Sequence, residues 1–120
     1  MLILFDNNVP RGLARALTGH TVTEARERGW ATLKNGDLLN AAEEAGFDVI
    51  VTSDKSIKYQ QNLEGRKIAL VVLTQGRWGP VRRMLAEIAA AVNAAAPGSY
   101  AEVLIPFVTT PASGSSGSSV

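Results

Sequence analysis

The sequence predicts a three-layer α/β/α sandwich built on a mostly parallel sheet. Three continuous apolar runs, at residues 2–5, 49–52 and 68–73, have the composition of strands that are buried on both faces. Segments rich in helix-forming residues separate these runs, and such alternation is typical of an α/β fold with a parallel sheet. Two of the runs lead directly into acids, Asp6 and Asp54.

Composition is that of an ordinary globular domain. The 120 residues favour a single domain, and 46% of them are hydrophobic. The absence of cysteine leaves no basis for a disulfide framework or a thiolate metal site. The net charge of +1 neither indicates nor excludes a nucleic-acid partner. Asp6 interrupts the first apolar run too early for a signal peptide, and no stretch reaches the length of a membrane span, so we expect a cytoplasmic protein.

The segment after the first run predicts a helix, a strand and a helical turn. Asn8 suits the N-cap of a helix whose first turn contains Pro10 and which ends at Gly19. Residues 20–23 are a short β-branched run and predict a strand. Residues 24–28 are charged and predict a helical turn.

A second helix is predicted at residues 35–45, which carry apolar side chains at helical spacing. Asn35 is the expected cap, and Asp37 lies in the first turn, where the helix dipole favours a carboxylate. Residues 55–63 are polar and predict one or two helical turns.

The last part of the domain predicts a long helix and an edge strand. The helix begins at Pro80 and carries one apolar stripe at the 3.6-residue period. Residues 100–108 predict an edge strand, because Pro106 lacks a backbone donor. We therefore expect a domain at residues 1–108 and a disordered Ser/Gly-rich tail at 109–120.

Three acids are the candidates for chemistry. Asp6 and Asp54 follow buried strands, whose carboxyl ends share one edge of the sheet if the crossovers are right-handed. Asp37 begins a helix that can face the same edge. Carboxylates gathered at one point repel each other unless a cation is present, and hard divalent cations prefer oxygen ligands. The pattern thus indicates a metal site that can orient water for attack on a phosphodiester.

Each acid taken alone also fits an ordinary structural role. Asp6 fits a helix cap, Asp37 a first-turn dipole partner, and Asp54 a strand-to-helix turn. Spacing alone leaves these alternatives open.

Polar neighbours of the acids are expected to support the site. Asn8 is a further oxygen ligand or orients a carboxylate, and Thr52 and Ser53 bind phosphate or position Asp54. The third strand is expected to deliver Gln75 and an arginine to the same edge.

Three segments, taken in order, resemble the small PIN-like proteins of predicted toxin–antitoxin systems. They are LFDNNVP at residues 4–10, DLL at 37–39 and VIVTSDK at 49–55, and the resemblance covers about residues 1–75. PIN domains are metal-dependent ribonucleases with clustered acids at the carboxyl ends of parallel strands. The resemblance therefore implies a PIN-like fold and a ribonuclease acting as a toxin.

By the same resemblance, Asp6, Asp37 and Asp54 are the catalytic acids and the ligands of Mg²⁺ or Mn²⁺, supported by Asn8 and Ser53. The implied partners are an RNA substrate and a cognate antitoxin protein. Exposed apolar surface on the last helix or edge strand could also serve a homodimer.

Two departures from the family pattern leave an alternative open. Asn7 stands where members often have an acid, and Ser56-Ile57 where they often have Asp-Phe. The alternative is a catalytically degenerate PIN-like module that binds protein or RNA. A receiver- or flavodoxin-like binding domain is a further alternative, although no glycine-rich phosphate loop follows the first strand.

Basic and aromatic residues near the expected site are candidates for RNA contact, because single-stranded RNA is held by cations and stacked on aromatic rings. They are Arg11, Lys55, Lys58, Arg77 and Trp78. Packing of Trp78 against its own domain is the other interpretation, and Trp30 allows the same two.

Overall fold

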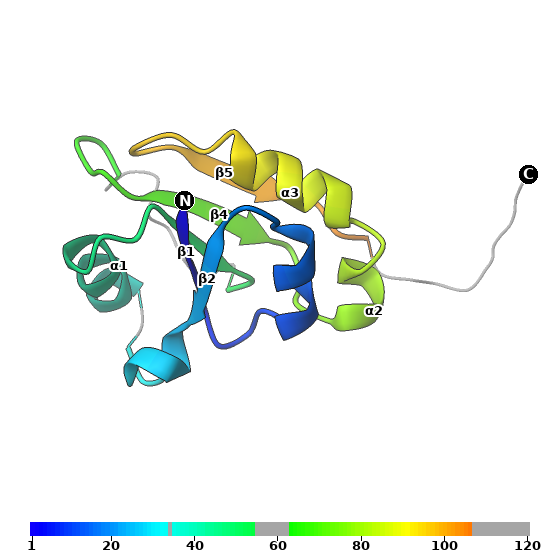
Figure 1. Ribbon diagram of the computed structural model, residues 1–120, viewed down its shortest axis with the longest axis horizontal. Coiled ribbons are helices and arrows are strands. Elements are labelled where there is room, and N and C mark those ends of the chain that lie inside the picture. The colour runs from blue at the N-terminus through cyan, green and yellow to red at the C-terminus, as the bar shows by residue number, and fades with distance from the viewer. Residues whose placement is uncertain (34, 55–62, 107–120) are drawn as a thin grey trace, which may run out of the picture.

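The chain folds around one five-stranded sheet in which every neighbouring pair of strands is parallel (Figure 1). The structure is a computed structural model that describes residues 1–33, 35–54 and 63–106. The strand order is β2-β1-β3-β4-β5. The strands are β1 (Leu2–Phe5), β2 (Thr21–Glu24), β3 (Val49–Thr52), β4 (Ala69–Leu73) and β5 (Tyr100–Val103).

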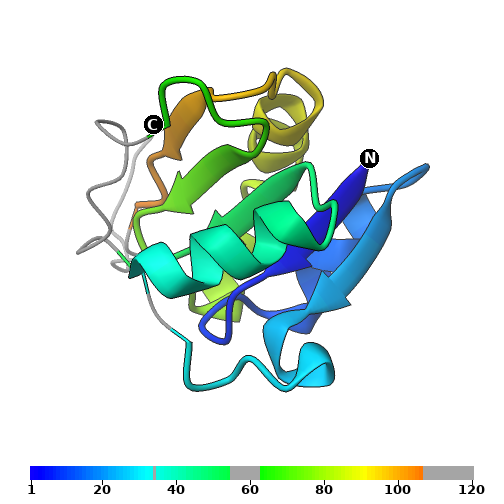
Figure 2. The ribbon, with the colours of Figure 1, turned by 90° about the vertical axis from the view of Figure 1, so that its left-hand side faces the viewer.

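Helices cover both faces of this sheet. Helix α1 (Asn35–Glu44) lies across one face, as Figure 2 shows, and α3 (Leu85–Asn93) packs on the other with the 3-10 helix η1 (Arg11–Ala16). The short helices η2 (Ala25–Arg28) and α2 (Trp78–Val81) follow β2 and β4. The three layers confirm the predicted α/β/α sandwich. No helix in the described ranges is long and apolar enough to cross a membrane.

Alternate side chains of the buried strands build two separate cores. Ile3 and Phe5 pack on the η1 and α3 side, while Leu4 between them packs on the α1 side. The same alternation divides the residues of β3 and β4. Both faces of the central strands are therefore buried, which is why these runs are apolar without interruption.

The first crossover differs from the predicted helix. It is a single 3-10 segment that begins after Pro10 and has no side-chain cap. The side-chain oxygen of Asn8 instead accepts the backbone N–H of Ser53 at 2.9 Å, so Asn8 joins two loops rather than capping a helix. Strand β2 lies one residue later than predicted and ends at Glu24.

The long helix predicted from Pro80 onward is broken in two. Helix α2 ends at Val81 and α3 begins at Leu85. The turn between them is tight, because Met84 donates its backbone N–H to the carbonyl of Val81 at 2.9 Å. The apolar stripe nevertheless stays on one face, since the buried side chains on both pieces belong to the same core: Val81, Ile88 and Val92.

The other differences are small. Helix α1 begins at Asn35 itself, β4 begins at Ala69, and β5 lies at the edge of the sheet as predicted but ends at Val103. The helical turns predicted at 55–63 lie, apart from residue 63, outside the described residues, as does the tail at 109–120.

The Glu43 carboxylate ties the end of α1 to the chain that leads into β4. Its Oε2 accepts the backbone N–H of Lys67 at 2.7 Å, and its Oε1 accepts Nη1–H of Arg66 at 2.9 Å. The Lys67 N–H and the Arg66 charge lower the pKa of Glu43, although desolvation opposes them. Because the folded pKa lies below the unfolded value, the group stabilises the fold above the unfolded pKa, and this contribution is lost as the pH falls through the folded pKa.

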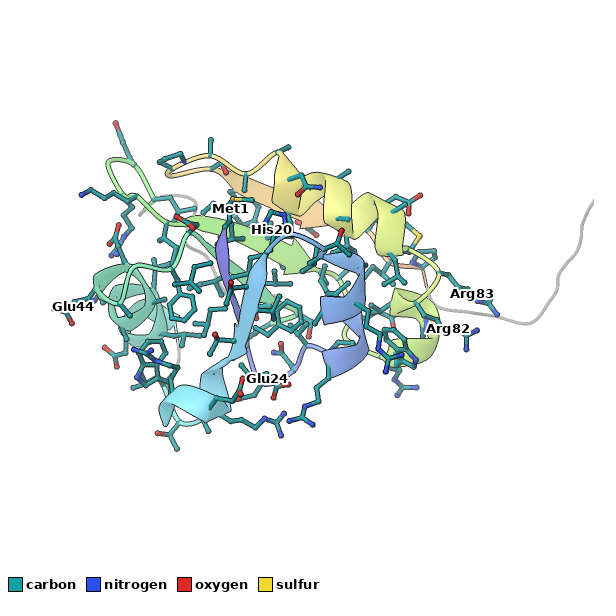
Figure 3. The ribbon with its side chains drawn as sticks, viewed as in Figure 1. Met1, His20, Glu24, Glu44, Arg82 and Arg83 are labelled. Carbon is teal, nitrogen blue, oxygen red and sulfur yellow. The ribbon has the colours of Figure 1, made fainter. Side chains whose placement is uncertain are left out.

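We expect Glu43→Gln to lower the free energy of unfolding by about 1 kcal/mol at neutral pH and to flatten its dependence on pH in the acid range. Urea denaturation between neutral pH and about pH 3 measures both effects. Glu44→Gln, at the neighbouring exposed position, is the control (Figure 3). A loss of stability from Glu43→Gln that is equal at both pH values would contradict this assignment.

Candidate functional site

Polar residues gather where β1 and β3 end. These strands are neighbours, and the chain continues from β1 to β2 on one side and from β3 to β4 on the other. The strand order therefore reverses between them, and open α/β sheets bind ligands at such points. Asp6 follows β1 directly, and Asp54 lies two residues past β3. The structure thus brings the two strand-end acids to one edge.

The Asp6 carboxylate is half-buried and oriented by two hydrogen bonds. Its Oδ1 accepts the backbone N–H of Asn7 at 2.8 Å, and its Oδ2 accepts the hydroxyl of Thr52 at 2.8 Å. Each oxygen keeps a lone pair for a further partner. Asp6 does not cap a helix, because the residue that caps η1 is Pro10.

A single buried hydroxyl connects the two acids. Thr52 is fully buried, and its Oγ1 donates to Asp6 Oδ2 and accepts the backbone N–H of Asp54 at 3.1 Å. The same residue therefore fixes the carboxylate that follows β1 and the turn that carries the acid after β3. Positioning of Asp54 is one of the two roles that the sequence left open for Thr52, and the hydrogen bond to the Asp54 backbone is consistent with it.

Three loops meet beside this link. Besides the bond to Asn8 Oδ1, Ser53 donates its hydroxyl to the Asn8 carbonyl at 3.3 Å. Gly76, which follows β4, packs against both residues, since a Cβ atom there would overlap the Asn8 carbonyl oxygen and lie 2.8 Å from Ser53 Oγ. The carboxyl ends of β1, β3 and β4 are therefore locked together.

Asp37 does not join the pair in a compact cluster. It is exposed in the first turn of α1, a position where the helix dipole already favours a carboxylate. Within residues 1–33, 35–54 and 63–106, no three His, Cys, Asp or Glu side chains form a group that could hold a metal ion. The expected convergence of Asp6, Asp37 and Asp54 is absent from this conformation, and the part that the structure brings together is the pair joined by Thr52.

The Asn7 side chain connects two loops by a hydrogen bond. Its Nδ2 donates to the backbone carbonyl of Ala31 at 2.7 Å, which ties the loop before α1 to the loop after β1. A carboxylate could not donate this bond. Asn7, which stands where the family often has an acid, therefore fixes the loop that precedes α1 next to the candidate site.

Glu24 also lies at this edge, although the sequence pattern did not mark it as a candidate. It ends β2 and pairs with Phe5, so it lies one register position from Asp6. Its Oε2 accepts Nε–H of Arg11 at 2.7 Å, and Arg26 Nε lies 3.0 Å from its Oε1. The hydrogen bond and then the charge of Glu24 raise the pKa of Arg11. Both oxygens of Glu24 thus face guanidinium groups, which disfavours a role as metal ligand.

The basic residues expected to contact RNA differ in their exposure and in their partners. Arg11 is bound to Glu24, although its side chain remains 75% exposed. Arg77 is exposed, and Lys55 and Lys58 lie outside the described residues. Gln75, expected at the edge beside the arginine, is instead buried and donates to the carbonyl of Ile105 at 3.1 Å.

The two tryptophans differ in their surroundings. Trp30 packs within the domain, with its ring 6.0 Å from that of Phe47 and the Arg28 guanidinium 4.9 Å from its centroid. Trp78 lies over Gly12, where a Cβ atom would meet three ring carbons at 2.6–2.9 Å. It is nevertheless 41% exposed. Trp78 therefore packs on the domain and keeps part of its ring open to a ligand.

Comparison with known protein families identifies the family of the segment that contains Asp6, Asp37 and Asp54. A family model described as a PIN like domain matches residues 1–75, which is more than half of the chain. The match includes strands β1 to β4 and helix α1. No curated protein and no solved structure matched the chain.

Proposed function

The chain belongs to the PIN-like domain family, which is usually nuclease-like, and from this premise we propose that it is a metal-dependent endoribonuclease. The observation that carries the proposal is the Thr52 hydroxyl, which links the Asp6 carboxylate to the Asp54 turn at 2.8 and 3.1 Å. A buried hydroxyl that holds one carboxylate and the backbone of a second acid, at a point of reversed strand order, is the arrangement expected of a binding site rather than of two separate caps.

The donor set fits a hard divalent cation. Mg²⁺ in proteins commonly takes one or two carboxylates and completes its coordination with water and phosphate oxygens. Asp6 offers two oxygens that each have one hydrogen bond, so both keep coordinating capacity. We propose that Asp6 and Asp54 are the principal ligands of Mg²⁺ or Mn²⁺, without Asp37, which lies apart from them.

When bound, such a cation supplies an activated water and neutralises charge on a phosphodiester. The residues of the chain position the reactants. Thr52 holds the Asp6 carboxylate, while Asn8 and Ser53 keep the two loops in register. Arg77, next to the loop junction, is available to a phosphate oxygen. In the reaction, the water oxygen would bond to phosphorus and release a proton to solvent, a P–O bond of the RNA would break, and the leaving oxygen would take up a proton from solvent.

We further propose that the protein is the toxin of a toxin–antitoxin pair. The resemblance of residues 4–10, 37–39 and 49–55 to small PIN-like proteins of predicted toxin–antitoxin systems supports this role. An apolar contact point is present at the sheet edge, where Leu104 follows β5 and is 73% exposed. An antitoxin or a second copy of the chain would cover this edge.

One observation favours the alternative of a degenerate PIN-like module that binds without cutting. Asn7 uses its amide to hold Ala31, so the structure depends on the absence of an acid at that position. A site with fewer carboxylates attracts a divalent cation less strongly.

Cleavage of RNA with and without metal separates these functions. We expect the intact chain to cleave a single-stranded RNA in Mn²⁺ or Mg²⁺ but not in excess EDTA. Asp6→Asn and Asp54→Asn should each reduce the rate by about 100-fold or more, since even residues that only support a metal ligand are worth roughly 10–100-fold.

Asp48→Asn is the matched control. Asp48 lies at the opposite, amino end of β3, and its Oδ2 accepts the Leu2 N–H at 2.8 Å, a bond that the asparagine oxygen can retain. Cleavage that persists unchanged in Asp6→Asn would refute the proposed mechanism. Absence of cleavage by the intact chain in every metal, with RNA binding retained, would establish the degenerate module.

A further inference from the structure

A cationic surface surrounds α2 and the turn after it. Residues 77–83 contain three arginines and no acid, and Arg77, Arg82 and Arg83 are all exposed. Figure 3 shows Arg82 and Arg83 extending away from the body of the molecule. None of the three forms an ion pair with another residue of the described part of the chain, whereas the described ion pairs neutralise arginines elsewhere. Their charges therefore remain available to an external anion.

An aromatic ring lies within the same surface. Trp78 is held against the backbone of Gly12, so its orientation is fixed before any ligand arrives. Arg82 donates its backbone N–H to the Trp78 carbonyl at 2.8 Å, which places the two residues one helical turn apart. Residues at this spacing lie on the same side of a helix. A partly open ring and a cation thus occupy one side of α2.

This surface begins at the candidate site. Gly76 packs against Asn8 and Ser53, the loop residues beside the paired acids, and Arg77 is the next residue along the chain. Consecutive Cα atoms are about 3.8 Å apart, so the Arg77 backbone lies next to the junction of the loops that carry the acids. A chain-like ligand that enters the site would extend over Trp78 toward the end of α2.

We propose that Arg77, Trp78, Arg82 and Arg83 form a binding surface for single-stranded RNA. The arginines match backbone phosphates, and the ring offers a stacking face to an unpaired base, which a base within a duplex cannot use. An acidic polypeptide such as polyglutamate would satisfy the arginines but offers no aromatic face to the adjacent ring. The choice of RNA rests on the proposed ribonuclease function, but the binding itself requires neither metal nor cleavage.

Fluorescence titration with an oligouridylate of about eight nucleotides, in excess EDTA, tests the surface. The chain has two tryptophans, and Trp30 packs inside the domain, so quenching should come from Trp78 and vanish in Trp78→Phe. Trp78→Ala should weaken binding about 10-fold. The double variant Arg82→Gln/Arg83→Gln should weaken binding. It should also reduce the magnitude of the slope of log K, the binding constant, against log salt concentration by about 1.4, at roughly 0.7 for each lost phosphate contact.

Lys67→Gln is the control, because it removes an exposed charge that precedes β4 at the opposite end of the sheet. Lys67→Gln should bind the oligouridylate with an affinity within about twofold of that of the intact chain. Thermal denaturation should show that every variant folds. Unchanged affinity in Trp78→Ala and in the double arginine variant would overturn the proposal. Equal affinity for duplex RNA or for polyglutamate, without dependence on Trp78, would also overturn it. Binding that depends on Trp78 in a chain that never cleaves RNA would refute the nuclease and leave this surface intact.

Discussion

Gly76→Ala is expected to lower the free energy of unfolding by about 2–3 kcal/mol and to disrupt the candidate site at the same time. The added Cβ atom would overlap the carbonyl oxygen of Asn8 and approach Ser53 Oγ to 2.8 Å. A backbone carbonyl cannot move aside as a flexible side chain can. Relief of the clash therefore has to separate the loops that follow β1, β3 and β4, and these loops carry the paired acids.

Gly79→Ala is the matched control. Gly79 lies in α2, and a Cβ atom there would meet no atom within 4 Å. Thermal denaturation should show a fall of roughly 10 °C in Tm for Gly76→Ala, whereas Gly79→Ala should be neutral or slightly stabilising. Equal melting temperatures for the two variants would mean that the three loops do not form a tight junction.

Thr52→Val is expected to cost about 1–3 kcal/mol of stability, because it leaves the Asp54 N–H and one Asp6 oxygen without their buried partner. Valine keeps the β-branched shape of threonine, so packing at this fully buried position is retained. Cleavage should fall by about 10–100-fold even under conditions where the variant is fully folded, since the hydroxyl orients the Asp6 carboxylate and holds the backbone of Asp54.

Thr52→Ser provides the rescue for this prediction. Serine retains the hydroxyl and removes a methyl group, so it should lose some packing energy while it keeps the link between the acids. Cleavage rates measured under conditions where every variant is folded should therefore follow the order threonine, serine, valine. A valine variant as active as the serine variant would show that the hydroxyl has no role at the site.

The sheet was predictable because its central strands are buried on both faces. β1, β3 and β4 are unbroken apolar runs, and such runs predict strands without knowledge of their partners. β2 is less regular and only partly buried, which is why its boundaries were less accurate. The acid that ends it, Glu24, was overlooked, although Val22-Thr23-Glu24 repeats the strand-then-acid pattern of Phe5-Asp6.

The break between α2 and α3 was not predictable from periodicity. The apolar stripe continues from Val81 to Ile88 across the turn, because both pieces pack on the same core. A period of 3.6 residues reports which face is buried, not whether the backbone stays helical between the buried positions.

The sequence predicted which strand-end acids lie at the candidate site, but not the hydrogen bonds that hold the site together. The strand-end position of Asp6 and Asp54 follows from the pattern alone. The hydrogen bonds of Asn7 and Asn8 do not follow from the pattern, because both side-chain amides bind segments distant in the sequence, at Ala31 and Ser53. Long-range hydrogen bonds of this kind depend on the assembled fold.

Asp6 and Asp54, joined through Thr52, are proposed to hold a divalent cation. A Mn²⁺ titration monitored by the electron paramagnetic resonance signal of the free ion measures this binding directly. We expect the intact chain and Asp48→Asn to bind Mn²⁺ alike, and Asp6→Asn and Asp54→Asn each to bind it at least about 10-fold more weakly. Equal Mn²⁺ affinity in all four proteins would show that Asp6 and Asp54 do not hold the cation.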